Sequence, residues 1–235
     1  MKKAIVTGHT RGLGAALAAE LQRRGFAVLG LARGASPLAG IEQVQLDMAD
    51  PAALEAWLGG GALRAFLEDA DLALLVNNAG VVTPVGPLAV QDPGEVLRAV
   101  ALNVGAPLAL AAAFVQASAR AERRIVHVSS GAARNAYPGW AVYCATKAAL
   151  DQHARAVRLD GDARVRACSL APGVIDTDMQ AAIRATPGAD FPLRQRFVDL
   201  KEGGGLDSPE ACARKLADYL LAPGFGAEPV DDLRN

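Results

Sequence analysis

Cysteine is scarce in this chain of 235 residues, which has only Cys144, Cys168 and Cys212. The three are odd in number, far apart and set in apolar surroundings. No spacing between cysteine and histidine suggests a zinc site. We therefore expect free buried thiols in a reducing compartment, with neither a disulfide framework nor a metal centre.

Charge of a single sign is also missing, because 24 Lys and Arg stand against 25 Asp and Glu. That balance gives no electrostatic pull toward nucleic acid or an anionic membrane. The longest apolar run, around residues 107–115, is shorter than the roughly 20 residues that a membrane helix needs. The N-terminal residues MKKAIVTGHTRG hold too few apolar residues for a signal peptide. We expect a soluble cytoplasmic protein.

What the chain does contain is an alternation of short β-rich runs and longer helical patterns, which is typical of βαβ units. Strands are predicted at 3–7, 27–32, 44–46, 72–77, 124–129, 165–170 and 229–231. Helices are predicted at 13–24, 52–58, 94–121, 143–159 and 209–221. The sequence thus predicts one α/β domain over residues 1–235. Its Rossmann-type doubly wound parallel sheet has about seven strands, with helices on both faces.

Residues 176–206 interrupt this alternation, because a short helical pattern is followed by Pro187, Pro192 and three consecutive glycines. A long connection in a compact domain is usually functional or disordered. This one follows a predicted strand, at the end where α/β proteins bind ligands. We interpret it as a substrate-binding lid, with a mobile surface excursion as the alternative.

A glycine-rich turn, IVTGHTRGLG, joins the first predicted strand to the first helix. Gly8, Gly12 and Gly14 permit a tight turn, close approach of the backbone to a pyrophosphate, and N–H groups directed at it from the helix N-terminus. The alternative is a turn with packing duties only. The strand–turn–helix setting favours a dinucleotide site.

The end of the second strand indicates which dinucleotide binds. A carboxylate there would accept hydrogen bonds from an NAD ribose, but this chain has Arg33 and no acid in reach. Arg33 and Arg11 are both suited to a 2′-phosphate, since a guanidinium offers a fork of donors. Each is alternatively an ordinary surface arginine. Together they favour NADP(H).

The stretch RIVHVSSGAARNAYPGWAVYCATKAAL combines a strand end, a loop and a helix start. Tyr143 and Lys147 lie four apart and share a helix face. A nearby ammonium lowers the pKa of a phenol, so Tyr143 is predicted to act as general acid in carbonyl reduction. Ser130 is predicted to hydrogen-bond the substrate oxygen. Tyr-x-x-x-Lys by itself occurs by chance in many proteins.

Taken together, these residues resemble the short-chain dehydrogenase/reductase family over nearly the whole chain. The matching pieces, in order, are TGHTRGLG, Asp47, NNAG at residues 77–80, Asn103, VSS, the Tyr143/Lys147 pair and APGVIDT at 171–177. The resemblance implies that Asn103 holds a water linked through Lys147 to Tyr143. It also implies that Lys147 binds the nicotinamide ribose.

The same resemblance implies a set of residues that bind the cofactor. Asp47 would contact the adenine, and Asn77 with its neighbours would line the adenosine ribose. The full expected set is Gly8, Thr10, Arg11, Gly12, Leu13, Gly14, Arg33, Asp47, Asn77, Ala79, Gly80, Tyr143, Lys147, Pro172, Gly173, Val174 and Thr177. The plainer alternatives are a buried amide at Asn103 and a simple turn at Pro172 and Gly173.

Within that family, GWAVYCATKAALD and APGVIDTDMQ are similar to the sepiapterin reductases and related bacterial reductases, some of which reduce benzil-type diketones. In sepiapterin reductases an acid near the C-terminus anchors the pterin, so Asp231 or Asp232 is a candidate, with a solvated acidic tail as the alternative. Trp140 and Met179 are further candidates for substrate contact, and Phe191, Leu193, Phe197 and Val198 are available to line an apolar pocket.

We therefore expect NADPH-dependent reduction of a small ketone or diketone. The alternatives are a 3-oxoacyl reductase or sugar-alcohol dehydrogenase, and a non-enzymatic protein that senses NADP(H). Alanine-rich helices that are apolar around much of their circumference indicate burial, either within the domain or against a partner. The resemblance implies that two of them form a homodimer interface, with a homotetramer also possible.

Overall fold

Seven parallel strands form one sheet at the centre of the molecule. The computed structural model describes residues 1–235, and its strands are ordered β3-β2-β1-β4-β5-β6-β7. In chain order the elements are β1 Lys2–Thr7, α1 Gly12–Arg23, β2 Ala27–Ala32, β3 Glu42–Gln45, α2 Pro51–Gly59, α3 Ala62–Leu67, β4 Leu72–Asn77, η1 Leu88–Val90, α4 Pro93–Val100, η2 Ala101–Gly105, α5 Ala106–Ala117, β5 Glu122–Val128, η3 Gly131–Ala133, α6 Ala141–Leu159, β6 Val165–Ala171, α7 Asp178–Ala185, α8 Arg194–Glu202, α9 Pro209–Leu221 and β7 Val230–Asp232. The predicted doubly wound sheet is confirmed, because the strand order reverses between β1 and β4.

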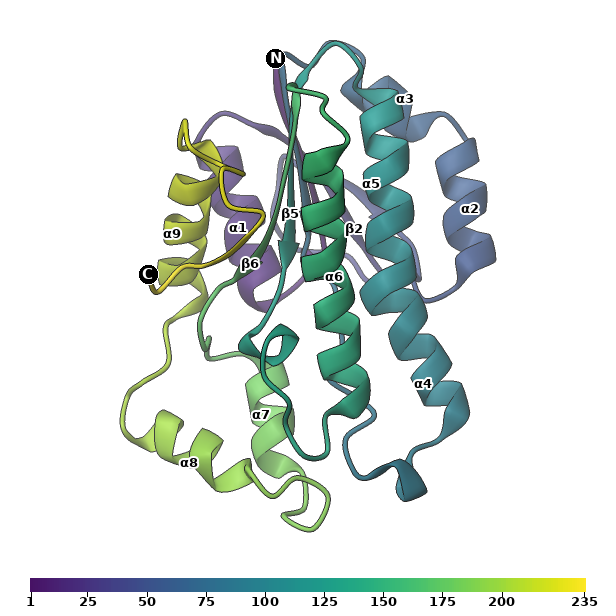
Figure 1. Cartoon of the computed structure of the whole chain (residues 1–235). Coiled ribbons are helices and arrows are strands. Elements are labelled where there is room, and N and C mark those ends of the chain that lie inside the picture. Colours follow the sequence, from purple (N-terminus) through teal and green to yellow (C-terminus); the bar gives the residue numbers. More distant parts are fainter.

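Helices cover both faces of the sheet (Figure 1). Helices α1 and α9 lie on one face and pack on alternate strand residues such as Val6, Val76 and Val126. On the other face α2, α3 and α5 pack on the residues in between, including Leu75 and Ile125. Because side chains alternate along a strand, each strand supplies both layers and reads as an apolar run without alternation.

The prediction of a helix at 94–121 is correct in position, but it is wrong in treating this segment as a single regular helix. It consists of α4, a π-helical turn over residues 101–105 and α5. A π turn inserts one extra residue, which hydrophobic periodicity does not reveal. Asn103, one of the expected catalytic residues, lies in this turn and is buried.

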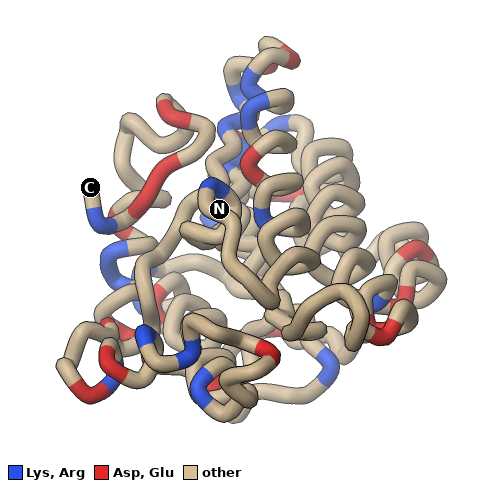
Figure 2. Tube along the Cα trace, turned by 60° about the horizontal axis from the view of Figure 1, so that its bottom comes forward, with Lys and Arg blue, Asp and Glu red and all other residues tan.

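The combined stretch Pro93–Ala117 has 25 residues, and an 18-residue window within it has a mean hydropathy of 1.7, enough by length and composition alone to cross a membrane. A single such helix is weak evidence for a membrane span, since the core helix of a sheet protein has the same composition. Here Leu110 and Phe114 pack on the sheet. The charged residues of this run, Glu95 and Arg98, both lie in α4, and α5 has none. Figure 2 shows acidic and basic residues interspersed over the rest of the chain.

The segment from 176 to 206 carries two helices, α7 and α8, below the carboxyl ends of the strands (Figure 1). An apolar cluster attaches it to the start of α6. Phe191 is completely buried and stacks on Trp140 with ring centroids 4.6 Å apart, and Phe197 packs against both rings. Gly139, the residue before Trp140, has a φ of +79°, and a Cβ there would stand 2.4 Å from the carbonyl oxygen of Asp190. The glycine thus permits close contact between this segment and α6.

Two imidazoles, of the buried His127 and the half-buried His153, join the sheet to α6. His127 on β5 contacts Asn77 Nδ2 through Nδ1 at 3.1 Å and His153 Nδ1 through Nε2 at 3.0 Å. Burial, and after it the neighbouring His153 and Lys147, lowers the pKa of His127 from its ordinary value of 6.5 to about 3. The folded protein therefore keeps this ring neutral under mildly acidic conditions.

Acid is expected to destabilise the fold at pH values well above those at which carboxylates titrate. The unfolded chain protonates His127 near pH 6.5 and the folded chain does so only near 3. The contribution of the neutral His127 to the free energy of unfolding is therefore complete above about pH 6.5, and it falls as the pH decreases. The loss is about 1.4 kcal/mol per pH unit for one such group. Urea unfolding at pH 7, 6 and 5 measures this slope. It should be smaller in His127→Gln, and equal slopes in the two proteins would contradict the assignment.

Candidate active site

A cavity of about 730 Å³ opens at the carboxyl ends of β1, β4, β5 and β6. The first three of these strands surround the point where the strand order reverses, which is where open α/β sheets bind ligands. The glycine turn forms one wall, and the loops after β4, β5 and β6 form the centre. Helices α7 and α8 close the remaining side.

Tight packing of the backbone shapes the glycine turn. A Cβ on Gly14 would stand 2.2 Å from the carbonyl oxygen of Gly8, so only glycine fits. The hydroxyl oxygen of Thr7 accepts hydrogen bonds from the backbone N–H groups of Asn78 and Ala79, each at 2.9 Å. The side-chain amide of Asn78 in turn donates to the carbonyl oxygen of Thr7 at 2.9 Å. These bonds hold the turn against the end of β4.

No side chain caps the N-terminus of α1, and its first residues, Gly12 to Gly14, line the cavity. The first N–H groups of a helix have no partner within the helix, and they carry its positive partial charge. Such a site fits the pyrophosphate of a dinucleotide.

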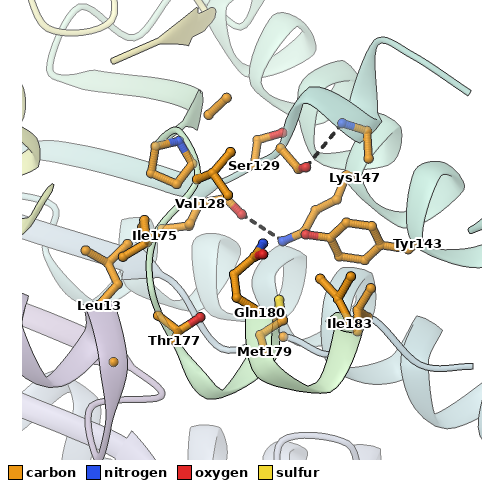
Figure 3. A pocket seen from close by; sticks show the side chains of 18 of the residues that line it. Leu13, Val128, Ser129, Tyr143, Lys147, Ile175, Thr177, Met179, Gln180 and Ile183 are labelled. Carbon is orange, nitrogen blue, oxygen red and sulfur yellow. Dashed lines mark hydrogen bonds between the residues drawn. The ribbon is translucent and has the colours of Figure 1, made fainter. Parts of the chain in front are cut away.

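Three expected catalytic residues meet at the centre of the cavity. Ser130 follows the end of β5, and Tyr143 and Lys147 lie on the first turns of α6. Figure 3 shows Tyr143 and Lys147 reaching into the same space. The ammonium of Lys147 donates to the carbonyl oxygen of Val128 at 2.7 Å, and its Nζ lies 5.7 Å from the centre of the Tyr143 ring. The hydroxyl oxygen of Ser130 accepts the N–H of Ala132 at 3.1 Å.

Burial dominates the acid–base character of the pair. It raises the pKa of Tyr143 to about 12, and the hydrogen-bonding Ser130 hydroxyl opposes this rise. It lowers the pKa of Lys147 to about 8, and the charge of Asp151 opposes that shift. The sequence-based expectation that the lysine would lower the pKa of the tyrosine does not hold for this structure, because both groups lose solvation. At neutral pH the phenol is protonated and is able to donate.

Asn103 lies beside this pair without bonding to it. Its Oδ1 accepts the N–H of Val81 at 2.9 Å, and its amide donates to the Val81 carbonyl oxygen at 2.8 Å and to Thr146 Oγ1 at 3.2 Å. A Cβ on Gly80 would stand 3.2 Å from Asn103 Oδ1 and 3.7 Å from Lys147 Nζ. A side chain at this position would crowd the space beside Asn103 and Lys147.

Most of the expected cofactor and substrate residues come together in the cavity. Those that line it are Gly8, Arg11, Gly12, Leu13, Gly14, Ala79, Gly80, Pro172, Gly173, Val174, Thr177, Trp140 and Met179. Trp140 is buried in the aromatic cluster, while Met179 comes from the first turn of α7. Of the other apolar lid candidates only Phe197 lines the cavity.

Five expected binding residues lie elsewhere. Thr10 and Arg33 stand outside the lining, and Arg33 is exposed. Asp47 pairs with Arg98 at 3.2 Å. The amide of Asn77, the last residue of β4, points to the α5 side and contacts the Pro107 carbonyl oxygen. Asn78, the next residue along the chain, faces the cavity instead, because side chains alternate along a strand.

Asp231 is the fifth expected binding residue outside the cavity lining, and its carboxylate forms hydrogen bonds away from the cavity. Its oxygens accept the hydroxyl of Tyr219 at 2.8 Å and the N–H of Asp232 at 2.8 Å. Asp232 pairs through both oxygens with Arg234, and it is Arg234 that lines the cavity.

Sequence reasoning missed several lining residues. Gln180 on α7 has a buried Oε1 without a protein partner, and Figure 3 shows its side chain on the lid side of the cavity with Met179 and Ile183. Asn78 and Gln180 both lie within motifs that the sequence contains, NNAG and DTDMQ, which was the available signal. Arg234 carried no such signal.

Comparison with known proteins agrees with this geometry. Residues 2–188 match the family described as short chain dehydrogenase. The chain belongs to the short-chain dehydrogenase family. It is 33% identical to a benzil reductase ((S)-benzoin forming) of Bacillus cereus, over 96% of each chain. It is 33% identical to the sepiapterin reductase of Xenopus laevis, over 94% of this chain and 91% of that protein. A short-chain dehydrogenase/reductase structure from Burkholderia vietnamiensis is 52% identical, with a TM-score of 0.70, over 99% of this chain and 98% of that chain.

The protein is accordingly a short-chain dehydrogenase that acts on carbonyl or alcohol groups with NAD(H) or NADP(H). The residues present fit such a cofactor. The uncapped start of α1 suits its pyrophosphate, and the loop after β6 lies beside Tyr143 and Lys147, where the nicotinamide must meet the substrate. This loop includes Pro172 and Gly173, whose φ of +86° only glycine adopts readily.

Proposed function

We propose that this short-chain dehydrogenase uses NADPH to reduce a ketone or vicinal diketone to an alcohol. The observation that carries the proposal is the meeting of Ser130, Tyr143 and Lys147 in one cavity between a dinucleotide turn and an apolar wall. Trp140, Ile183 and Phe197 belong to that wall. Such a site suits a substrate with an aromatic or aliphatic body and one or two carbonyl oxygens.

NADPH, when bound along the turn, supplies the hydride for the carbonyl carbon. Tyr143 donates its phenolic proton to the carbonyl oxygen as negative charge develops there. Ser130 donates a second hydrogen bond to the same oxygen, which stabilises that charge. The ammonium of Lys147 stabilises the phenolate left on Tyr143. With the pKa of Tyr143 raised to about 12, the resting protein already holds the proton that reduction requires.

The 2′-phosphate is assigned to Arg33, with Arg11 nearby on the turn. Arg33 is exposed at the end of β2, and its side chain forms no ion pair or hydrogen bond within the protein. Arg11 pairs at 3.2 Å with Asp178, the first residue of α7, and both side chains are largely exposed. That pair connects the dinucleotide turn to the lid.

The two carboxylates near the C-terminus favour a diketone substrate over a pterin, because both are already bonded to other side chains of the protein. A pterin would need a carboxylate facing the cavity, whereas Asp231 bonds to Tyr219 and Asp232 pairs with Arg234. The related benzil reductases point the same way. A 3-oxoacyl or sugar-alcohol substrate is the alternative, and the complete catalytic set argues against a non-enzymatic sensor.

The proposal includes a cytoplasmic homodimer. Helices α4 and α5 follow one another end to end, and α6 lies beside them on the same face (Figure 1). Leu97 and Val100 on α4 are 71% and 43% exposed there. Exposed large apolar side chains next to an alanine-rich helix suit burial against a second copy.

A substrate panel tests the proposed activity. Benzil, sepiapterin, an acetoacetyl thioester and a ketose are each mixed with NADPH, and loss of the nicotinamide absorbance is followed. Benzil is expected to give the highest kcat/KM, because its two rings suit the apolar wall. Faster turnover of the thioester or the ketose would overturn the diketone assignment.

Tyr143→Phe is expected to lower kcat by about 10²- to 10⁴-fold, the usual contribution of a general acid. The phenyl ring preserves the contact with Trp140, whose centroid is 5.3 Å away. Tyr137→Phe is the matched control, because Tyr137 also lines the cavity and packs on Trp140 at 5.6 Å. The control should retain most of its activity. Similar rates for the parent and Tyr143→Phe would show that another group donates the proton.

Arg33→Ala is expected to raise KM for NADPH about ten- to a hundredfold and to leave KM for NADH nearly unchanged. The reason is loss of a charge-assisted pair with the 2′-phosphate, which is worth about 1.5–3 kcal/mol. Steady-state kinetics with both cofactors measures this. Arg64→Ala on α3, outside the cavity lining, is the control. Equal changes for both cofactors would contradict the assignment.

A further inference from the structure

Behind the catalytic residues, Asp151 forms a buried polar junction that the proposed chemistry does not use. Its side chain is 2% exposed, and its Oδ1 accepts hydrogen bonds from Ser129 Oγ at 2.9 Å and Ser169 Oγ at 2.7 Å. The second oxygen has no hydrogen bond but forms an ion pair with Arg134 Nε at 3.5 Å. One carboxylate thus joins α6, the end of β5, β6 and the loop after η3.

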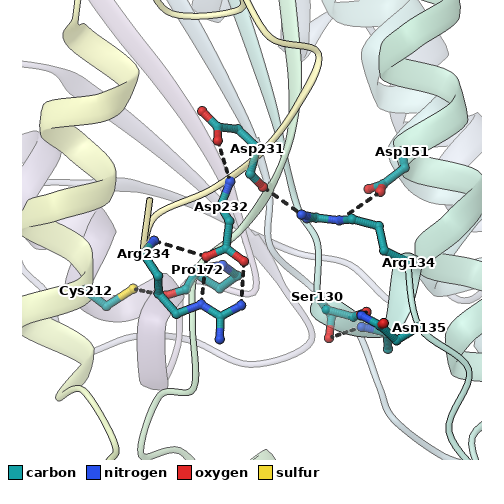
Figure 4. Close-up of polar contacts among 11 residues, drawn as sticks. Ser130, Arg134, Asn135, Asp151, Pro172, Cys212, Asp231, Asp232 and Arg234 are labelled. Atoms are coloured by element: carbon teal, nitrogen blue, oxygen red, sulfur yellow. Dashed lines mark hydrogen bonds and ion pairs between the residues drawn. The ribbon is translucent and has the colours of Figure 1, made fainter.

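This junction is adjacent to the reacting groups. Asp151 follows Lys147 by four residues on α6, so the two buried side chains lie on one face of the helix about one turn apart. Its hydrogen-bond donor Ser129 immediately precedes Ser130. Arg134 completes the junction and also donates to the carbonyl oxygen of Asp231 at 3.1 Å, as Figure 4 shows. Asp151 itself does not line the cavity.

We propose that Asp151 is the positioning residue of this active site: its buried negative charge keeps Lys147 an ammonium, and its two serine bonds hold Lys147 in register with Ser130. Burial of a lysine favours the neutral amine, which does not stabilise a phenolate. A carboxylate one helical turn away opposes that effect without entering the cavity. The partners of Asp151 hold this carboxylate in a fixed position.

Other charges around the lysine do not take this role. Tyr143 on α6 is a neutral phenol, and His127 on β5 is held neutral by burial. Burial raises the pKa of the Cys168 thiol on β6, so it too is neutral. Arg134, on the loop after η3, pairs with Asp151, and the carboxylate of Asp231 on β7 is bonded to Tyr219. Burial lowers the pKa of Lys147 to about 8, and Asp151 is the group that raises it.

Asp151→Asn is the sharpest test, because an asparagine oxygen still accepts both serine hydroxyls while the charge is lost. NMR titration of lysine side-chain carbons in the cofactor-free protein, assigned with Lys147→Arg, follows the Lys147 ammonium directly. Its pKa is expected to fall by on the order of one pH unit, as for a unit charge one turn away in a partly buried site. An unchanged titration in a folded Asp151→Asn protein would overturn the proposal.

Two further variants separate charge from architecture. Ser169→Ala removes one hydrogen bond and keeps the charge, so the Lys147 titration should stay in place. Arg134→Met removes the counter-ion, so the thermal midpoint should fall while the pKa of Lys147 stays unchanged or rises. A downward shift in either variant would overturn the charge argument, even if Asp151→Asn does not fold.

The kinetic consequence rests on the proposed role of Lys147 in the reduction. In Asp151→Asn the pH at which kcat is half-maximal should decrease on the basic side, making the protein about fivefold slower than the parent at pH 8. KM for the ketone should be unchanged. The two proposals fail separately. A shifted titration with an unshifted rate profile would remove Lys147 from the mechanism and leave the electrostatic role of Asp151 intact.

Discussion

The hydrogen bond from Lys147 Nζ to the carbonyl oxygen of Val128 is the contact on which the site depends. It joins the first turns of α6 to the end of β5, so Tyr143 and Ser130 cannot move independently. An ammonium is a strong donor, and a buried backbone carbonyl needs a partner. The same bond that orients the lysine also satisfies the strand end where the parallel sheet stops.

Near this bond, packed aromatic side chains exclude water on one side, and the cavity lies on the other side. The aromatic cluster of Trp140, Phe191 and Phe197 seals α7 and α8 against the start of α6. Tyr143 belongs to the same cluster, and its burial raises its pKa. Packing of the lid against the start of α6 therefore contributes to the protonated state of Tyr143.

Much of the fold was readable from local pattern. The second and fourth predicted strands have the observed bounds, as does the last predicted helix, because apolar runs bounded by glycine, proline and polar residues leave few alternatives. The turn at residues 101–105 was not readable, since a π turn alters hydrogen bonding without altering composition. Nor was the choice between Asn77 and Asn78, which differ only in the face of the strand end that each occupies.

The sequence by itself determined the family, the sheet, the dinucleotide turn and the identity of Ser130, Tyr143 and Lys147, because these depend on residue type and local spacing. The tertiary structure decided which charges reach the site. Asp231, expected at the substrate, is bound to Tyr219, and Arg234 takes the place at the cavity. Asp151, which had no motif to mark it, lies behind the lysine. Electrostatic coupling acts through space and depends on burial, and neither is visible until distant segments of the chain have packed together.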